Sequence, residues 1–224
     1  MIAPLTPFAI QGFIWYQGEN TSLLAAYQIR LPAMIRDWRE AWKLGDFPFL
    51  LVQLPPFSNV SPASDWAAVR EAQTLPTTVL PRVGIVVTTD VGEETDIHPN
   101  RKQPVGERLA RLARRIAYNQ KIVASGPTFR SMRVVGNRAI LTFDNVGAGL
   151  DARGGKLTGF AIAGDDHKFV PADAAIVGRI VVVTSPVVPH PAAVRFGWAN
   201  YPIVNLWNKD GLPAVPFRTD GPAE

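Results

Sequence analysis

A carboxylate and an imidazole stand two residues apart in the stretch from Thr89 to Asn100, where Asp96 is followed by Ile97 and His98. A carboxylate this close can orient an imidazole, and an oriented imidazole is the usual base in acyl transfer. The same residues are also typical of a helix-capping Asp and an ordinary polar His in a loop. The spacing alone favours that structural interpretation over a catalytic one.

The flanking elements place this stretch at a sheet edge. The apolar run from Val83 to Val87 precedes it and predicts a buried strand, and a periodic basic stretch from Arg101 to Tyr118 predicts a helix after it. The stretch therefore lies at the carboxyl end of a strand, where open α/β sheets usually carry their chemistry.

Two more strand and helix pairs are predicted upstream. Residues 12–17 suit a buried strand, and the apolar residues of 23–42 recur at the spacing of an amphipathic helix. Residues 49–54 predict a second strand, and Asp65 predicts the cap of a helix over residues 66–75. The alternation of strand and helix indicates parallel strands with right-handed crossovers.

The pattern changes at Ser125-Gly126-Pro127. Residues 126–199 hold short alternating runs separated by turn signals, among them Gly136-Asn137, which predicts a hairpin. We therefore expect a partial α/β domain over 1–125 and a smaller antiparallel β-rich domain over 126–199. Residues 200–224, rich in Pro, Asn and aromatic residues, are predicted to form an irregular tail packed on the body.

Composition excludes several classes of function. Lys and Arg exceed Asp and Glu by 23 − 19 = 4, and the basic helix carries neither interleaved aromatic residues nor a nucleic-acid motif, so we expect no nucleic-acid partner. No apolar run approaches about eighteen residues, so no membrane span is predicted. Cysteine is absent and the three histidines are scattered, so neither a metal site nor a cofactor is expected. The N-terminus does not resemble a signal peptide.

Several motifs in order resemble one family, the sialate O-acetylesterases, which are SGNH-type carbohydrate esterases. The resemblance covers essentially the whole chain. The motifs that carry it are Gly12-Phe-Ile-Trp-Tyr-Gln-Gly-Glu-Asn20, Asp96-Ile-His-Pro-Asn-Arg-Lys102, Gly106-Glu-Arg-Leu-Ala110, Gly159-Phe-Ala-Ile-Ala-Gly164, Ala192-Ala-Val-Arg-Phe-Gly-Trp198, Asn205-Leu-Trp-Asn208 and Gly211-Leu-Pro-Ala-Val-Pro-Phe-Arg-Thr219.

The resemblance implies a three-layer, parallel-sheet SGNH-hydrolase-like α/β domain, present here in part, and an ester hydrolase with a Ser-His-Asp site. In that family a serine attacks an acetyl ester, and a histidine held by an acidic residue transfers the proton. Carried over, His98 is the base and Asp96 its orienter. SGNH hydrolases generally place the acid three residues before the histidine, where this chain has Thr95. Asp90 is therefore a second candidate for the acid.

The turn after the first strand matches the block that supplies oxyanion donors in the family. The Gly-x-Asn pattern of the superfamily fits Gly18 and Asn20, Gln17 can share the donor role, and Glu19 can shape the pocket. The structural alternative for these residues is a turn that ends a strand and caps the next helix.

The family's nucleophile motif, a Gly-x-Ser element after the first strand, is absent. Ser22 and the loop serines Ser58, Ser61 and Ser64 lack its context, so the chain resembles the C-terminal portion of a longer protein. A sheet of three strands, where the family has about five, leaves an apolar edge open. We therefore expect homo-oligomerisation, or a need for the missing N-terminal segment. Relatives are often exported, but the compartment of this chain stays open.

Three functions remain possible at this point. The first is a carbohydrate O-acetylesterase that acts on O-acetylated sugars with a serine from outside the chain. The second is an inactive fragment that binds carbohydrate, with sugars stacking on aromatic rings. The third is an enzyme of two chains. The rings considered for stacking are Trp15, Tyr16, Trp198 and Trp207, for which core packing is the alternative.

Overall fold

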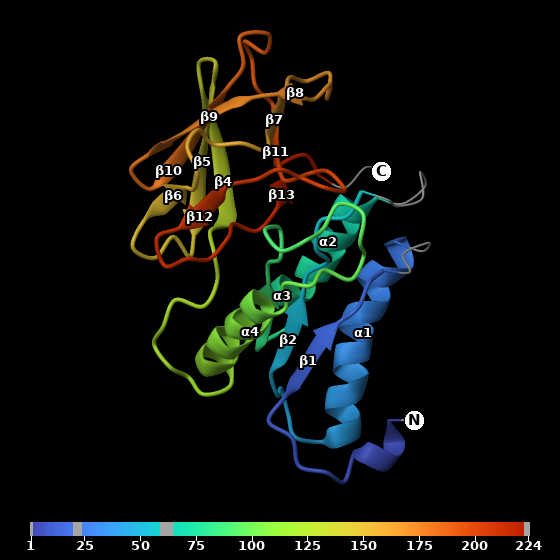
Figure 1. The fold of residues 1–224 in the computed structure, drawn as a ribbon. Coiled ribbons are helices and arrows are strands. Elements are labelled where there is room, and N and C mark those ends of the chain that lie inside the picture. Colours follow the sequence, from blue (N-terminus) through green and yellow to red (C-terminus); the bar gives the residue numbers. More distant parts are fainter. Residues whose placement is uncertain (1, 20–23, 59–64, 222–224) are drawn as a thin grey trace. The chain divides into compact units, whose positions relative to one another are not determined.

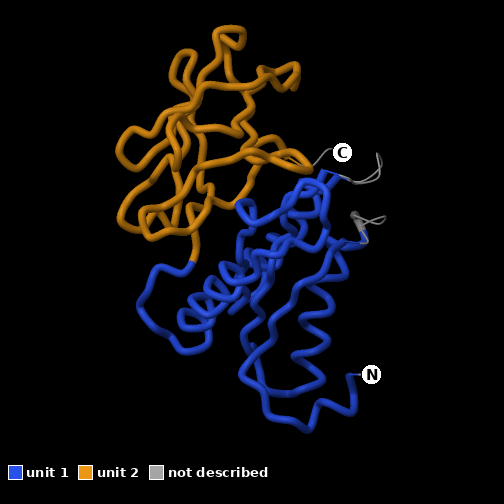
Figure 2. Tube along the Cα trace, in the orientation of Figure 1, with its two compact units in different colours: residues 1–124 blue, residues 125–224 orange. Residues whose placement is uncertain are grey.

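The computed structural model of the chain describes residues 2–19, 24–58 and 65–221. By its internal contacts the chain divides into two compact units, residues 1–124 and residues 125–224 (Figure 2). The first unit contains all the helices of the described residues, and the second is built from β-strands.

A three-stranded parallel sheet forms the centre of the first unit. Its strands are β1 (Phe13–Tyr16), β2 (Phe49–Val52) and β3 (Val83–Val86), and they lie side by side in that order (Figure 1). The prediction of three parallel strands is confirmed, with ends that differ by one or two residues. Because the strands run in the same direction, the segments that follow them emerge at one edge of the sheet.

The helices of this unit are α1 (Leu24–Trp42), α2 (Trp66–Thr74), α3 (Pro76–Val79) and α4 (Gln103–Ile116), and a short 3₁₀ helix η1 (Ala3–Leu5) lies near the N-terminus. Successive side chains of β2 point to opposite faces of the sheet. Phe49 and Leu51 pack with Ile35 of α1, whereas Leu50 packs with Leu112 of α4. The amphipathic periodicity of α1 and α4 is thus used to bury apolar side chains on strand residues.

The start of α2 agrees with the sequence in detail. A carboxylate oxygen of Asp65 accepts a hydrogen bond from the backbone N–H of Ala68 at 2.9 Å, so Asp65 is the N-cap as predicted. The short helix α3 that follows was not part of the expected pattern, because four residues are too few to show a helical period.

The described residues of the second unit form antiparallel strands. They are β4 (Thr128–Val135), β5 (Arg138–Asp144), β6 (Leu150–Ala152), β7 (Phe160–Ala163), β8 (Val170–Pro171), β9 (Asp173–Val177), β10 (Ile180–Thr184), β11 (Ala193–Phe196), β12 (Leu206–Asn208) and β13 (Phe217–Arg218). These strands form three sheets, with orders β4-β5-β10-β9, β13-β11-β7-β8 and β12-β6. The predicted Gly136-Asn137 hairpin is confirmed, since it joins β4 to β5 and Gly136 takes a φ of 59°.

The last segment differs from the prediction of an irregular tail over residues 200–224. Its residues supply β12, which pairs with β6, and β13, which pairs with β11. Leu206 and Phe217 are buried in the core of this unit. Strands of two or three residues between prolines are too short for an alternating pattern, so the sequence offered no signal for them.

Candidate active site

Three segments meet at the carboxyl edge of the parallel sheet. They are the turn at residues 17–19 after β1, residues 53–54 after β2, and the loop at residues 87–100 after β3. Tyr16, the last residue of β1, packs in one apolar cluster with Leu54 and Ile97. The end of β1 and the loop that carries His98 therefore pack against the same apolar cluster.

Asp96 and His98 lie together in the loop after β3. A carboxylate oxygen of Asp96 accepts a hydrogen bond from the backbone N–H of His98 at 2.8 Å, and the same atom lies 4.0 Å from Nδ1 of the ring. The His98 side chain is 85% exposed. The backbone bond fixes Asp96 beside the imidazole, but 4.0 Å is longer than a hydrogen bond. Catalytic hydrogen bonds are often long before substrate binds, so this distance is compatible with a catalytic base and the residue that orients it.

Asp90, the second candidate for the acid, makes a different set of contacts. Its two carboxylate oxygens accept hydrogen bonds from the Arg108 guanidinium at 2.6 and 2.7 Å, and its backbone carbonyl accepts one from Arg101 at 2.9 Å. Arg108 also donates to the carbonyl of Val87. Asp90 thus ties the start of the loop to α4. Among the described residues, the Asp90 carboxylate is bound by Arg108, and no hydrogen bond or ion pair joins it to His98.

The turn after β1 is held by its backbone. The carbonyl of Gln17 accepts hydrogen bonds from the Tyr27 hydroxyl at 3.0 Å and from Nε2 of Gln73 at 2.9 Å. The N–H of Gly18 donates to the side-chain carboxylate of Glu19 at 2.8 Å. In this conformation an oxyanion would have to displace Glu19 to reach the Gly18 N–H. Asn20, the remaining predicted donor, lies outside the described residues.

Gly18 is required by both conformation and space. Its φ of 151° disfavours residues with a side chain, and an added Cβ would lie 2.9 Å from Nε2 of Gln73 and 3.2 Å from Cδ1 of Leu54. The glycine therefore lets the turn approach α2 and the end of β2 closely.

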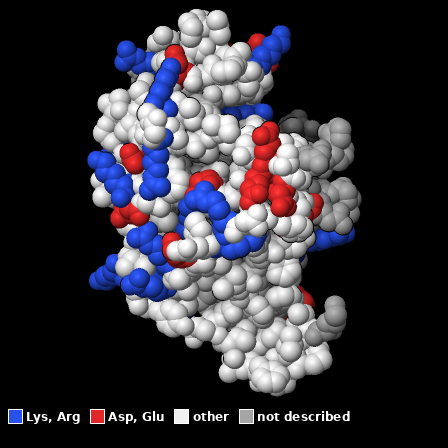
Figure 3. All heavy atoms as spheres, viewed as in Figure 1, with Lys and Arg blue, Asp and Glu red and all other residues white. Residues whose placement is uncertain are grey.

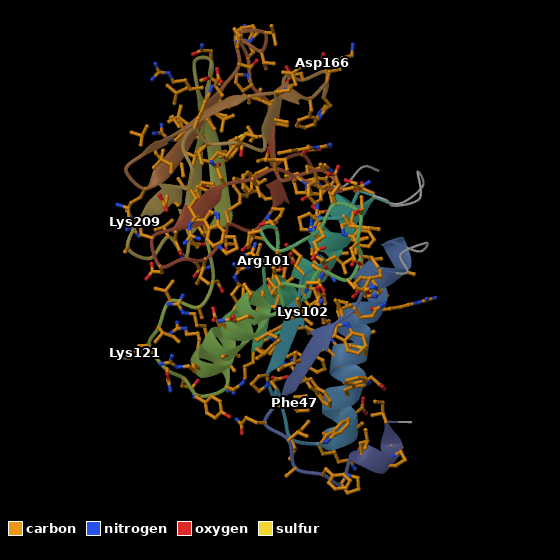
Figure 4. All side chains as sticks on the ribbon, viewed as in Figure 1. Phe47, Arg101, Lys102, Lys121, Asp166 and Lys209 are labelled. Carbon is orange, nitrogen blue, oxygen red and sulfur yellow. The ribbon has the colours of Figure 1, made fainter. Side chains whose placement is uncertain are left out.

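The Tyr16 side chain lies near charged groups of both signs, Glu19 and Lys102. Burial, and to a smaller extent the nearby Glu19 carboxylate, raise the pKa of the Tyr16 phenol to about 12. The Lys102 ammonium lies 5.3 Å from the centre of the same ring, and Arg101 precedes it in the segment before α4 (Figure 4). On the face drawn in Figure 3, acidic side chains lie among basic ones.

The aromatic residues considered for sugar stacking are engaged with other side chains. Trp15 lies edge-on to Trp38 at 5.7 Å, and the Arg153 guanidinium lies 3.7 Å over the ring of Trp207, which is only 7% exposed. Arg195 and Arg218 lie over Trp198 at 5.5 and 4.8 Å.

Of the four candidate serines, the structure describes only Ser58. Ser58 contacts Glu94 through its backbone and its hydroxyl. Ser22, Ser61 and Ser64 lie outside the described residues. In the part of the chain that the structure describes, no group of three or more His, Asp or Glu side chains could hold a metal ion, and no helix is long and apolar enough to cross a membrane.

Sequence reasoning missed Gln73 and Arg108 as residues of this edge. A signal for Gln73 was present, because it stands seven residues after Trp66 and four after Val69 on the buried face of α2. A polar residue at an apolar position of a helix indicates a specific polar partner. No comparable signal marked Arg108 within a helix that carries several arginines.

These features define an α/β protein with a histidine and a carboxylate side by side in a loop at the carboxyl edge of a parallel sheet. The family described as "Carbohydrate esterase, sialic acid-specific acetylesterase" matches residues 3–115, which is half of the chain and covers this edge completely. The chain therefore belongs to the sialic acid-specific acetylesterase family of carbohydrate esterases.

Individual relatives extend the similarity over nearly the whole chain. The crystal structure of a carbohydrate acetylesterase from Xanthomonas citri matches with a TM-score of 0.91 and 44% identity, over 97% of this chain and 52% of that one. The sialate O-acetylesterases of Homo sapiens and Mus musculus are 28% and 26% identical over 97% of this chain, and 47% and 46% of theirs. The chain thus spans about half the length of the relatives it matches.

Proposed function

We propose that this protein takes part in the hydrolysis of acetyl esters on carbohydrates, with O-acetylated sialic acids as the leading substrate class. The observation that carries the proposal is the Asp96-Ile97-His98-Pro99 sequence, which exposes Asp96 and His98 in the loop after β3, inside the region that matches the family. The names of the human, mouse and Xanthomonas citri relatives support this class of reaction.

The proposed mechanism is that of a Ser-His-Asp hydrolase. His98 removes the proton from a serine hydroxyl as that oxygen attacks the acetyl carbonyl, and then donates it to the departing sugar hydroxyl. Asp96, 4.0 Å from Nδ1, moves into a hydrogen bond with the ring and stabilises the imidazolium. A water molecule then cleaves the acetyl-enzyme by the same route, with His98 again as the base.

The residues after β1 are proposed to face the oxyanion. Gln17, Gly18 and Asn20 supply donors, and Glu19 shapes the pocket. We place the nucleophilic serine outside this chain, because Ser58 is engaged with Glu94 and the other serines lack the sequence context of a nucleophile. The site is proposed to be complete when a second polypeptide segment supplies that serine.

The proposal also assigns the two domains of the chain. Residues 1–125 are proposed as part of a three-layer SGNH-hydrolase-like domain that carries the acid and base. Residues 126–199 form the β-rich domain, to which residues 200–224 add β12 and β13.

The test is ester hydrolysis by the purified chain, alone and mixed with the N-terminal half of the Xanthomonas citri relative. p-Nitrophenyl acetate and an O-acetylated sialic acid are the substrates. His98→Ala is expected to lower kcat by about 10³-fold or more, and Asp96→Asn by about 10²-fold or more. The matched control is His190→Ala, which removes an imidazole from the second unit. Hydrolysis that persists in His98→Ala would contradict the proposed role of that residue as the base. Saturable sugar binding without turnover would favour a carbohydrate-binding module.

A further inference from the structure

A single buried amide joins the turn after β1 to the end of β2. Gln73, on α2, is 2% exposed. Its Nε2 donates a hydrogen bond to the carbonyl of Gln17 at 2.9 Å, and its Oε1 accepts one from the backbone N–H of Leu54 at 2.8 Å. Both ends of the carboxamide are thus bound to backbone atoms of two different strand ends.

The turn packs tightly against the Gln73 side chain and is also held by α1. A Cβ on Gly18 would lie 2.9 Å from Nε2 of Gln73, so the side chain lies directly against the turn. The Tyr27 hydroxyl from α1 donates to the same Gln17 carbonyl at 3.0 Å, which holds the peptide from a second side. The carbonyl of Gln17 is therefore fixed by donors from α1 and α2, and its neighbour Gly18 has no room to drift toward α2.

Only an amide side chain of this length satisfies both partners. It presents a donor and an acceptor a fixed distance apart, whereas a carboxylate presents two acceptors. A carboxylate at this position would keep the bond from Leu54 but would set a negative oxygen against the Gln17 carbonyl. An apolar side chain of similar size would lose both bonds: the buried Leu54 N–H would lose this acceptor, and the Gln17 carbonyl would keep only the Tyr27 hydroxyl as a donor.

We propose that Gln73 is a positioning residue of the ester-hydrolysing site: it sets the orientation of the Gln17–Glu19 turn and so the direction of its oxyanion donors. This inference rests on the proposed function. Gln73 acts through the turn and does not touch the substrate. Misplacement of such donors by about 1 Å is enough to lower a rate by about 10²-fold.

Two variants and one control separate positioning from general stability. Gln73→Leu removes both hydrogen bonds, and Gln73→Glu removes only the donor to Gln17. Thr74→Val is the matched control, because its hydroxyl contacts Arg70 and Gln53 rather than the turn. It therefore removes a neighbouring polar group of α2 and leaves the turn in place.

The first measurement is the hydrogen-exchange protection of the Gly18 and Leu54 amides, followed by NMR in the purified chain. Gln73→Leu is expected to lower protection about tenfold or more at both amides, and Gln73→Glu at Gly18 alone. When the pH is lowered from about 8 to about 5, the introduced carboxyl takes up a proton and can donate to Gln17, so protection of Gly18 is expected to return. Equal protection in all variants, or equal loss in Thr74→Val, would overturn the proposal.

The second measurement is the kinetics of p-nitrophenyl acetate hydrolysis under the conditions in which the unmutated chain is active. Both Gln73 variants are expected to lower kcat by about 10- to 100-fold, with KM changed by less than about threefold. A loss confined to KM, or a kcat equal to that of Thr74→Val, would overturn the role in positioning. If the unmutated chain hydrolyses no ester under any condition, the proposed function fails, and the exchange measurement alone then decides whether Gln73 orders the turn.

Discussion

The ion pair between Asp90 and Arg108 offers the sharpest test of how the loop after β3 is held. We predict that Asp90→Asn destabilises the first unit, and that Arg108→Met does so by a similar or larger amount. Arg108 links three points of this edge, since its guanidinium binds both carboxylate oxygens of Asp90 and the carbonyl of Val87. Arg115→Met is the control, because Arg115 lies on the same helix but is exposed.

The expected magnitude follows from the burial of the pair. Breaking a buried ion pair by removing one partner costs about 3–5 kcal/mol. The Arg108 and Asp90 side chains are 9% and 19% exposed, so the pair is nearly but not fully desolvated. We therefore expect Asp90→Asn to lower the free energy of unfolding by about 2–3 kcal/mol. Arg108→Met also frees the Val87 carbonyl, which adds about 1 kcal/mol.

A double-mutant cycle measures the interaction itself. Urea unfolding followed by far-ultraviolet circular dichroism reports on the first unit, because every helix of the described residues belongs to it. The coupling energy between the two positions is expected to be about 1.5–3 kcal/mol. The Arg115→Met control is expected to stay within about 0.5 kcal/mol of the unmutated chain.

Two results would refute this reasoning. A coupling energy below about 0.5 kcal/mol would mean that the pair contributes no more than an exposed salt bridge. An Asp90→Asn variant with full stability but no ester hydrolysis would return Asp90 to the role of the acid that orients His98, in place of Asp96.

Three other predictions concern packing, pH and association. Gly84→Ala would place a methyl group 2.5 Å from Cδ1 of Ile116 and should lower the free energy of unfolding, measured by urea titration, by about 1–3 kcal/mol. Gly106→Ala is the control: the space around Gly106 is open, so this variant should be neutral or stabilising. Burial raises the pKa of the Tyr16 phenol from its ordinary value of 10.0 to about 12, so the folded state favours the neutral phenol. The contribution of Tyr16 to stability is therefore fully present below about pH 10 and is lost as the pH rises through 12. Tyr16→Phe should reduce this alkaline loss of stability, by less than about 2 kcal/mol, and an unchanged dependence of stability on pH would contradict the prediction. Strand β1 lies at an edge of the described sheet with Ile14 63% exposed, so the chain should self-associate in light scattering and Ile14→Lys should weaken this; a monodisperse unmutated monomer would count against it.

Most of the first unit could be predicted from local sequence. The apolar runs predicted β1, β2 and β3 to within two residues, and the period of residues 23–42 predicted α1. Asp65 was correctly predicted as a cap, because an Asp before a helical pattern bonds to atoms only three residues away. These features depend on residues close together in the chain, so the local sequence is enough to predict them.

The candidate site was predicted only in part. Asp96 and His98 were expected to lie together because they are two residues apart, and the structure brings them within 4.0 Å. The contacts of Asp90 with Arg108, 18 residues away, left no local pattern. The strands of residues 206–208 and 217–218 were missed because they are too short for an alternating pattern, and only their pairing with β6 and β11 defines them.

The sequence by itself determined the three parallel strands and the long helices of the first unit, the adjacency of a histidine and a carboxylate, and the resemblance to the family. Only the tertiary structure decided which polar groups hold that edge together. Gln73 reaches the Gln17 carbonyl across 56 residues, and the bond matters because the Gln73 amide is buried away from water. A buried polar group must find a partner wherever the fold supplies one, and that choice is made by packing in three dimensions rather than by spacing along the chain.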